Sequence, residues 1–175
     1  MLRIGGIQCG LDLWEIVICP ALLTNSGTWS GLTKEHLKEL EDLQLYFLRR
    51  LFQVPRTTPK PSLLYDTNTM KMKLRVYKNI LNFIKHVSSF EEECLAKDIL
   101  QEQVTNKWGG LVADAMEISD NHGIDGLLDD RVTKKMFKKK LKAVFKSINE
   151  DEIKDDMNPY KKMEKMKSEE SKGNH

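Results

Sequence analysis

The stretch "TKEHLKELEDLQLYFLRRLFQV", residues 33–54, decides the fold class of this 175-residue chain. Its apolar residues recur every three or four positions, the spacing of one face of an α-helix. Thr33 is suited to be the N-cap, and the three prolines of "PRTTPKP" at 55–61 end the helix in an extended connector. The predicted buried face consists of Leu37, Leu40, Gln44, Phe47 and Leu51, broadened by Leu43 and Leu48. We therefore predict an amphipathic helix here.

Most of the remaining segments have the same helical periodicity. Residues 7–23 form an apolar segment that Pro20 should kink or divide. Residues 70–87, 108–118 and 131–148 are further predicted helices. The apolar face of 70–87 consists of Met72, Val76, Ile80, Phe83 and Val87. No segment has the alternation that a β-strand would need, so the pattern favours helices throughout.

Polar residues predict where two more helices begin. Ser89 with Glu92 forms a capping box for a helix that continues to about 104. Asn149 with Glu152 is the expected cap of a last, weaker helix. From about residue 161 the chain is mostly Lys, Glu, Met and Ser, a composition typical of disorder.

These segments predict an all-α protein: an irregular array of about six or seven amphipathic helices with a disordered charged C-terminal tail. Residues 1–60 form the N-terminal helices and 61–148 a helical region with two basic faces. Residues 149–175 form the charged tail.

Charge is unevenly distributed in a chain whose net charge is only +2. Residues 49–85 hold nine basic residues and one acidic residue, and 131–148 hold eight basic residues and no acidic one. Residues 86–130, between them, hold two basic and eleven acidic residues. Separated basic blocks can bind a polyanion even when the whole chain is nearly neutral, although the acidic block can also pack beside them.

The first basic block has a cationic helix face opposite its apolar face. At about 100° per residue, its cations fall within about 80° of one another, as a row of phosphate-binding side chains requires. These cations are Lys71, Arg75, Lys78 and Lys85, preceded in the chain by Arg49, Arg50 and Arg56. Arg49 and Arg50 are equally explained by the preference of cations for the C-terminal end of a helix.

The second basic block has the same design. Its apolar face consists of Phe137, Leu141, Val144, Phe145 and Ile148, and its cationic face of Lys135, Lys139, Lys142 and Lys146. Such a helix is typical of a nucleic-acid surface, a calmodulin-type target or a membrane-surface helix, and equally of a solvated lysine face.

No motif predicts an active site, a cofactor or a metal centre. The "LLDD" of 127–130 contains two adjacent aspartates, and polymerases use such a pair to hold metal ions. A helix follows it, however, so a capping role explains the pair better. Cys9, Cys19 and Cys94 form no C-x-x-C pair, which indicates free thiols in a reducing compartment. Asp12 and Glu15 interrupt the apolar N-terminal run, so we expect neither a signal peptide nor a membrane span.

Several spaced elements together resemble a known family. They are the Leu-Trp-Glu of 13–15, the "PALL" of 20–23 followed by an Asn-Ser turn and Trp29, the "LxxLQxxFLRRLxxVP" pattern of 40–55, "LYDTNTMKMKLR" at 64–75 and "ECLAKDIL" at 93–100. In this order they resemble the region after the polymerase core, the thumb and beyond, in reverse transcriptases of non-LTR retrotransposons.

The resemblance implies a catalytically incomplete C-terminal fragment of such an enzyme, whose catalytic aspartates would lie upstream of residue 1. We expect it to bind the backbone of RNA or of an RNA–DNA duplex without sequence preference, and to have the missing polymerase core as its partner. The expected location is intracellular, in the nucleus or cytoplasm, with no membrane and no small-molecule substrate. The alternative is a helical protein-interaction module with no role in nucleic-acid binding.

Overall fold

A computed structural model gives the backbone of residues 4–172, except residues 92, 107 and 108, and the side chains of 5–160 within that range. In this part of the chain every regular element is helical, which confirms the predicted all-α class. The elements are α1 (Ile4–Leu13), the π-helical turn η1 (Trp14–Ile18), α2 (Cys19–Leu22), the 3₁₀ turn η2 (Ser26–Thr28), α3 (Lys34–Phe52), α4 (Lys60–Thr67), α5 (Met72–Ser88), α6 (Leu95–Thr105), α7 (Leu111–Asn121) and α8 (Lys134–Lys172). Since α1, η1 and α2 are continuous, the described chain has the predicted number of helices.

The N-terminal helix passes Pro20 without dividing. The backbone N–H of Cys19 donates to the carbonyl of Trp14, five residues earlier, which is the bonding pattern of a π-helical turn. Pro20 then lies in the first turn of the short helix α2, where its missing N–H is tolerated. The extra residue of the π turn therefore accommodates the proline that the sequence predicts to kink or divide the helix.

Helix α3 follows the prediction closely at its start. The Thr33 hydroxyl accepts from the backbone N–H of His36, and the His36 side chain accepts from that of Thr33, which forms a capping box. The helix ends at Phe52, and Gln53 adopts a left-handed conformation. The connector after it is shorter than predicted, because α4 begins at Lys60 with Pro61 in its first turn.

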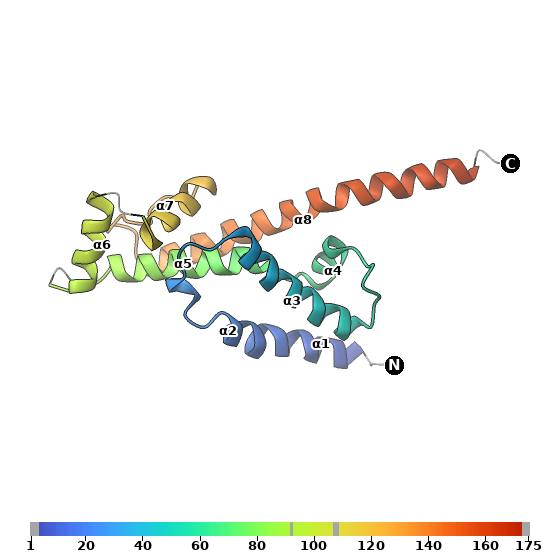
Figure 1. Ribbon diagram of the computed structural model, residues 1–175, viewed down its shortest axis with the longest axis horizontal. Helices are drawn as coiled ribbons and strands as arrows, with labels where there is room; N and C mark the ends of the chain where they lie inside the picture. The colour runs from blue at the N-terminus through green and yellow to red at the C-terminus, as the bar shows by residue number, and fades with distance from the viewer. Residues whose placement is uncertain (1–3, 92, 107–108, 173–175) are drawn as a thin grey trace.

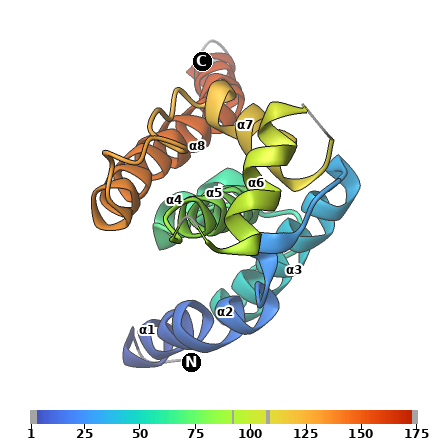
Figure 2. The same ribbon diagram turned by 90° about the vertical axis from the view of Figure 1, so that its left-hand side faces the viewer.

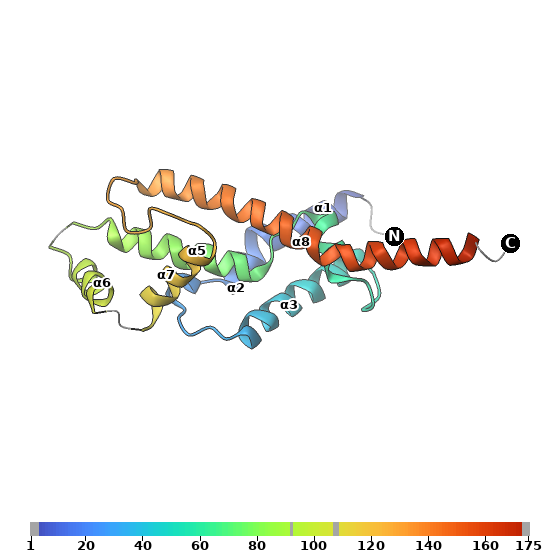
Figure 3. The same cartoon turned by 90° about the horizontal axis from the view of Figure 1, so that it is seen from above.

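Helix α5 is the centre of the molecule. It contacts α3, α6, α7, α8 and the turn η2, and Figures 1 and 3 show α8 running alongside it. Its buried residues include Leu74, Leu81 and Ile84, which lie outside the predicted apolar face. The turn η2 comes so close to α5 that a Cβ at Gly27 would lie 2.8 Å from the Cβ of Phe83. Helix α5 is therefore covered on several sides, not on one face.

Helix α8 is one continuous element where the sequence predicts two helices. It runs through Asn149, which is 5% exposed. The Asn149 side-chain oxygen accepts from the backbone N–H of Lys71 at 2.9 Å, so this residue caps α5 instead of starting a helix of its own. The backbone of 161–172 continues α8 away from the other helices (Figure 1). The frayed tail expected from about 161 stays a prediction.

One large apolar cluster fills the space around α5. It joins the N-terminal helix, α5, α6, α7 and the first half of α8 through residues such as Trp14, Leu81 and Phe145. A smaller cluster of Leu48, Leu64 and Ile153 joins α3, α4 and α8. The large cluster thus contains residues from both sides of the predicted boundary at 60. Seen from the left-hand side of Figure 1, the N-terminal helix and α8 lie on either side of α5 (Figure 2).

Candidate nucleic-acid interface

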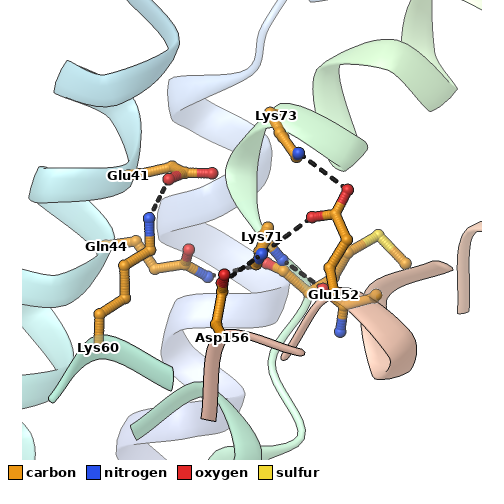
Figure 4. Close-up of polar contacts among 9 residues, drawn as sticks. Glu41, Gln44, Lys60, Lys71, Lys73, Glu152 and Asp156 are labelled. Atoms are coloured by element: carbon orange, nitrogen blue, oxygen red, sulfur yellow. Dashed lines mark hydrogen bonds and ion pairs between the residues drawn. The ribbon is translucent and has the colours of Figure 1, made fainter. Parts of the chain in front are cut away.

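Lys71, the first cation of the face predicted for 70–87, is buried against α8. Its Nζ donates to Glu152 Oε2 at 2.9 Å and to Asp156 Oδ2 at 2.8 Å, and the residue is 6% exposed. Figure 4 shows both contacts, together with the second ion pair of Glu152, to Lys73. Burial alone would lower the pKa of the Lys71 amine, but its hydrogen bonds to the two carboxylates raise it. Lys71 therefore fastens α5 to α8 and is not available to a phosphate.

Lys85, the last cation of that face, is also buried. Its Nζ donates to the backbone carbonyls of Gly126 at 3.1 Å and Asp129 at 2.8 Å, and it lies 5.7 Å from the centre of the Phe137 ring. It holds the loop before α8 against α5. The interpretation of α5 as a helix with a row of four exposed cations is therefore wrong, because tertiary packing covers both ends of that row.

The three arginines before α5 lie apart from the remaining cations. Arg49, which is half-buried, donates from Nη2 to the carbonyl of Thr58 at 3.1 Å and so holds the connector after α3. Arg50 and Arg56 are exposed. None of the three lines the groove, described next, that four of the other predicted cations share. Their role in nucleic-acid binding stays a prediction.

Four predicted cations meet in one groove between the N-terminal helix and α8, above α5. The groove is a cavity of about 380 Å³. Its cations are Arg75 and Lys78 from α5, and Lys142 and Lys146 from α8. The two predicted basic faces therefore do come together. Only the two middle cations of the α5 row and the last two lysines of the α8 face line the groove.

The electrostatics of the groove centre on Lys78, which is half-buried. In the described part of the chain, no acidic side chain lies within ion-pair distance of its amine. Burial lowers the pKa of Lys78, and three neighbouring cations lower it further. These neighbours are Arg75, Lys142 and Lys138. An excess of positive charge at this point favours an anionic ligand.

The outward face of α8 extends this positive surface. Lys135, Lys139, Lys142 and Lys146 are all exposed, as predicted. At about 100° per residue, these four lysines fall within an arc of about 60°. Their ion pairs among the described residues are limited to Lys146 with Glu150 at 3.9 Å, a weak surface contact. Lys138 is not among the predicted cations, although it belongs to the basic block of residues 131–148.

Acidic residues also line the groove: Asp12 and Glu15 come from the N-terminal helix, and Glu150 comes from α8. Glu15 pairs with Arg75 through Oε1 and Nη2 at 2.5 Å. Asp12 lies one turn earlier and accepts from Gln8 at 2.9 Å. Glu15 was not predicted as part of any site, because nothing in the sequence indicates that residues 15 and 75 meet.

A second cavity, of about 280 Å³, lies between α5, α7 and the loop that precedes α3. Trp29, Tyr77 and His122 line it, with Asp114 and Glu117. Burial lowers the pKa of His122, whose ring lies 5.9 Å from that of Tyr77. The Asp114 carboxylate accepts from the backbone N–H of Gly31 at 2.8 Å, so it holds the loop. The lining of this cavity has two carboxylates against one lysine, Lys73, so the cavity lacks the net positive charge of the groove.

The paired aspartates of the "LLDD" segment are placed outside both cavities just described. Asp129 accepts from the backbone and side chain of Arg131, both at 3.0 Å. The cap of α8 is instead Thr133, whose hydroxyl accepts from the N–H of Met136 at 3.4 Å. The predicted capping role of the aspartates is therefore wrong, because three residues lie between Asp130 and Lys134, the first residue of the helix.

The N-terminal helix is apolar and largely exposed. The 18 residues Gly5–Leu22 have a mean hydropathy of 1.2, and 11% of this window is buried. By length and composition it could cross a membrane, although Trp14 and Cys19 are anchored in the core. The expectation that the chain does not contact a membrane stays a prediction.

Comparisons with family models, with curated proteins and with solved structures gave no match to this chain.

Proposed function

We propose that the chain binds the sugar–phosphate backbone of RNA or of an RNA–DNA duplex without sequence preference, as a thumb-like helical region of a retrotransposon-type reverse transcriptase. Under this proposal the chain acts inside the cell, holds nucleic acid and carries no polymerase chemistry of its own. Support for the family comes from the spaced motifs of residues 13–100, which resemble the segment after the polymerase core.

The observation that carries the binding proposal is the meeting of Arg75, Lys78, Lys142 and Lys146 in one groove. Successive lysines four residues apart on α8 are separated by about 6 Å along the helix axis, at about 1.5 Å per residue. Such a row places one cation on each helical turn, which suits the regular charges of a nucleic-acid backbone. Contacts of this kind recognise charge and shape, not bases.

One observation favours the alternative, a helical protein-interaction module. Leu13, Ile16 and Val17 of the N-terminal helix are 48%, 73% and 54% exposed. Apolar side chains gathered on one exposed surface are typical of protein-binding sites. A protein contact through this stripe would depend little on salt, whereas phosphate contacts weaken steeply as salt rises.

Fluorescence anisotropy with a labelled 20-nucleotide RNA, alone and paired with DNA, tests the proposal. We expect the triple variant Lys78→Gln, Lys142→Gln, Lys146→Gln to bind at least about tenfold more weakly than the wild type, with a salt slope smaller by about 2. The matched control, Lys34→Gln, Lys38→Gln, Lys154→Gln, removes the same charge from exposed positions outside the groove. Equal losses in both variants, or no binding by the wild type, would overturn the proposal.

A further inference from the structure

The groove continues into a neighbouring cavity, different from the one lined by Trp29 and His122, and one ion pair lies between the groove and this neighbour. The first cavity, of about 380 Å³, and its neighbour, of about 280 Å³, share three lining residues. These are Glu15, Arg75 and Lys78. This neighbouring cavity continues along the N-terminal helix past Cys19, Pro20 and Leu23 to Asn79 of α5. The pair of Glu15 and Arg75 thus lies at the junction of a longer depression.

Arg75 is held in place before any ligand arrives. Its Nε donates to the carbonyl of Met70 at 3.2 Å, which turns Nη2 toward the N-terminal helix. The side chain of Arg75 is 17% exposed, against 42% for that of Glu15. The cation is therefore a fixed part of the groove wall, whereas its carboxylate partner is accessible to solvent.

The fold also fixes the segment that carries Glu15. Trp14, its neighbour, is 1% exposed and stacks on Phe47 of α3 with ring centres 4.9 Å apart. The π-helical turn begins at Trp14, and such turns reorient side chains relative to a regular α-helix. While Trp14 faces the core, Glu15 faces the groove, where it is the one carboxylate paired with a groove cation of α5 among the described residues.

At this junction Glu15 is the one carboxylate among the residues that line both cavities, whereas Asp12 and Glu150 line only the groove. Glu15 faces Arg75 and lies close enough to Lys78 to oppose the lowering of its pKa by burial and by neighbouring cations. A phosphodiester group also carries a negative charge and accepts hydrogen bonds from a guanidinium, as a carboxylate does. The Glu15 carboxylate therefore has the chemistry of the ligand that the surrounding cations would bind.

The size of the cavities indicates which form of nucleic acid enters. Both are near the lower end of the range of about 300–1,000 Å³ that holds small molecules. An A-form duplex is wider than either cavity and would rest on the rim, whereas a single strand can place one backbone unit in each cavity.

We propose that Arg75, Lys78 and Lys142 form a phosphate subsite in which the Glu15 carboxylate is an internal stand-in, displaced when a single-stranded polynucleotide lies along the groove. This inference rests on the proposed function and refines it, because it names the single strand as the preferred ligand and Glu15 as the residue that limits affinity.

Glu15→Gln tests the subsite, with Asp12→Asn as the matched control. Both substitutions raise the net charge by one, and both residues line the groove, but only Glu15 pairs with Arg75. We expect Glu15→Gln to bind a labelled 20-nucleotide single-stranded RNA about tenfold more tightly than the wild type, because the strand no longer competes with a charged partner. Asp12→Asn should gain about twofold or less, the share due to net charge alone. Thermal melts check that both variants are folded.

The outcomes separate this inference from the function on which it rests. If the wild type binds RNA and the two variants gain equally, the subsite is refuted and the binding function stands. If Glu15→Gln strengthens the binding of an RNA–DNA duplex as much as that of the single strand, the preference for a single strand is refuted. If neither the wild type nor Glu15→Gln binds any RNA, both proposals fail.

Discussion

Replacing Lys71 by Met should damage the fold and spare nucleic-acid binding, the reverse of what the sequence suggests. The Lys71 amine donates to Glu152 and Asp156, and its side chain is 7% exposed. Hydrogen bonds to charged groups contribute about 1.5–3 kcal/mol each, and breaking a fully buried ion pair costs about 3–5 kcal/mol. Asp156 is 50% exposed and regains water, so we expect a loss of about 2–3 kcal/mol.

Urea unfolding followed by circular dichroism measures this loss. In a thermal melt, the same loss should lower the Tm by about 5–10 °C in a chain of this length. Lys154→Met is the matched control. Its side chain is 59% exposed and its amine pairs with Asp151 at 3.8 Å, so we expect a change within about 0.5 kcal/mol. At a temperature where both variants are folded, their RNA affinity should equal that of the wild type. A Lys71→Met variant with unchanged stability and weakened RNA binding would refute the assignment.

Three further results follow from packing and charge. Leu48→Ala should cost about 2–5 kcal/mol in urea unfolding, because Leu48 is fully buried where α3, α4 and α8 meet, whereas Leu43→Ala, 42% exposed, should cost under about 1 kcal/mol. A thiol reagent should label the exposed Cys9 quickly and Cys19 only on unfolding, since burial raises the pKa of Cys19, and equal rates would contradict its burial. Burial raises the pKa of Glu152, but hydrogen bonds from Lys73 and Lys71 outweigh it and lower the pKa below the ordinary value of about 4.5. The charged Glu152 therefore contributes its full stability above about pH 4.5, and this contribution is lost as the pH falls through the lower pKa of the folded state. The Glu152→Gln variant should therefore lose less stability than the wild type on acidification. If the free energies of unfolding of the two proteins fall in parallel with pH, the ion pairs of Glu152 with Lys71 and Lys73 contribute nothing.

Local rules predict those elements whose signals lie within a few residues of one another. Thr33 caps α3 as expected, because the capping box involves only residues three apart. The lysine face of α8 is also exposed as expected, since the opposite apolar face settles its orientation. In both cases the pattern is local and the partner is either the same helix or the core.

Signals that depend on a distant partner were misread. Lys71 and Lys85 have the spacing of a solvent-facing row, but α8 and the loop before it cover both ends of that row. Asn149 has the character of a helix cap, yet the backbone that it caps is 78 residues away. Amphipathic spacing assumes one buried face, and it fails for a central helix such as α5, which is covered on several sides.

The candidate site combines both kinds of information. Its cations are evident in the charge blocks, whereas the groove that selects four of them arises only when α5, α8 and the N-terminal helix pack together. The pair of Glu15 with Arg75 joins residues 60 positions apart, so no local pattern indicates that they meet. Sequence alone therefore identifies the candidate cations, and packing decides which of them share the groove.

The affinity of the wild-type chain for a single-stranded RNA, measured across a series of salt concentrations, tests the central claim most directly. Arg75, Lys78, Lys142 and Lys146, with Lys138 beside them, can neutralise four or five phosphates. Single strands release about 0.7 counterion for each phosphate neutralised, so log K should fall against log salt with a slope of about −3. A slope near zero, or no binding at low salt, would contradict the assignment of the groove to a nucleic-acid backbone.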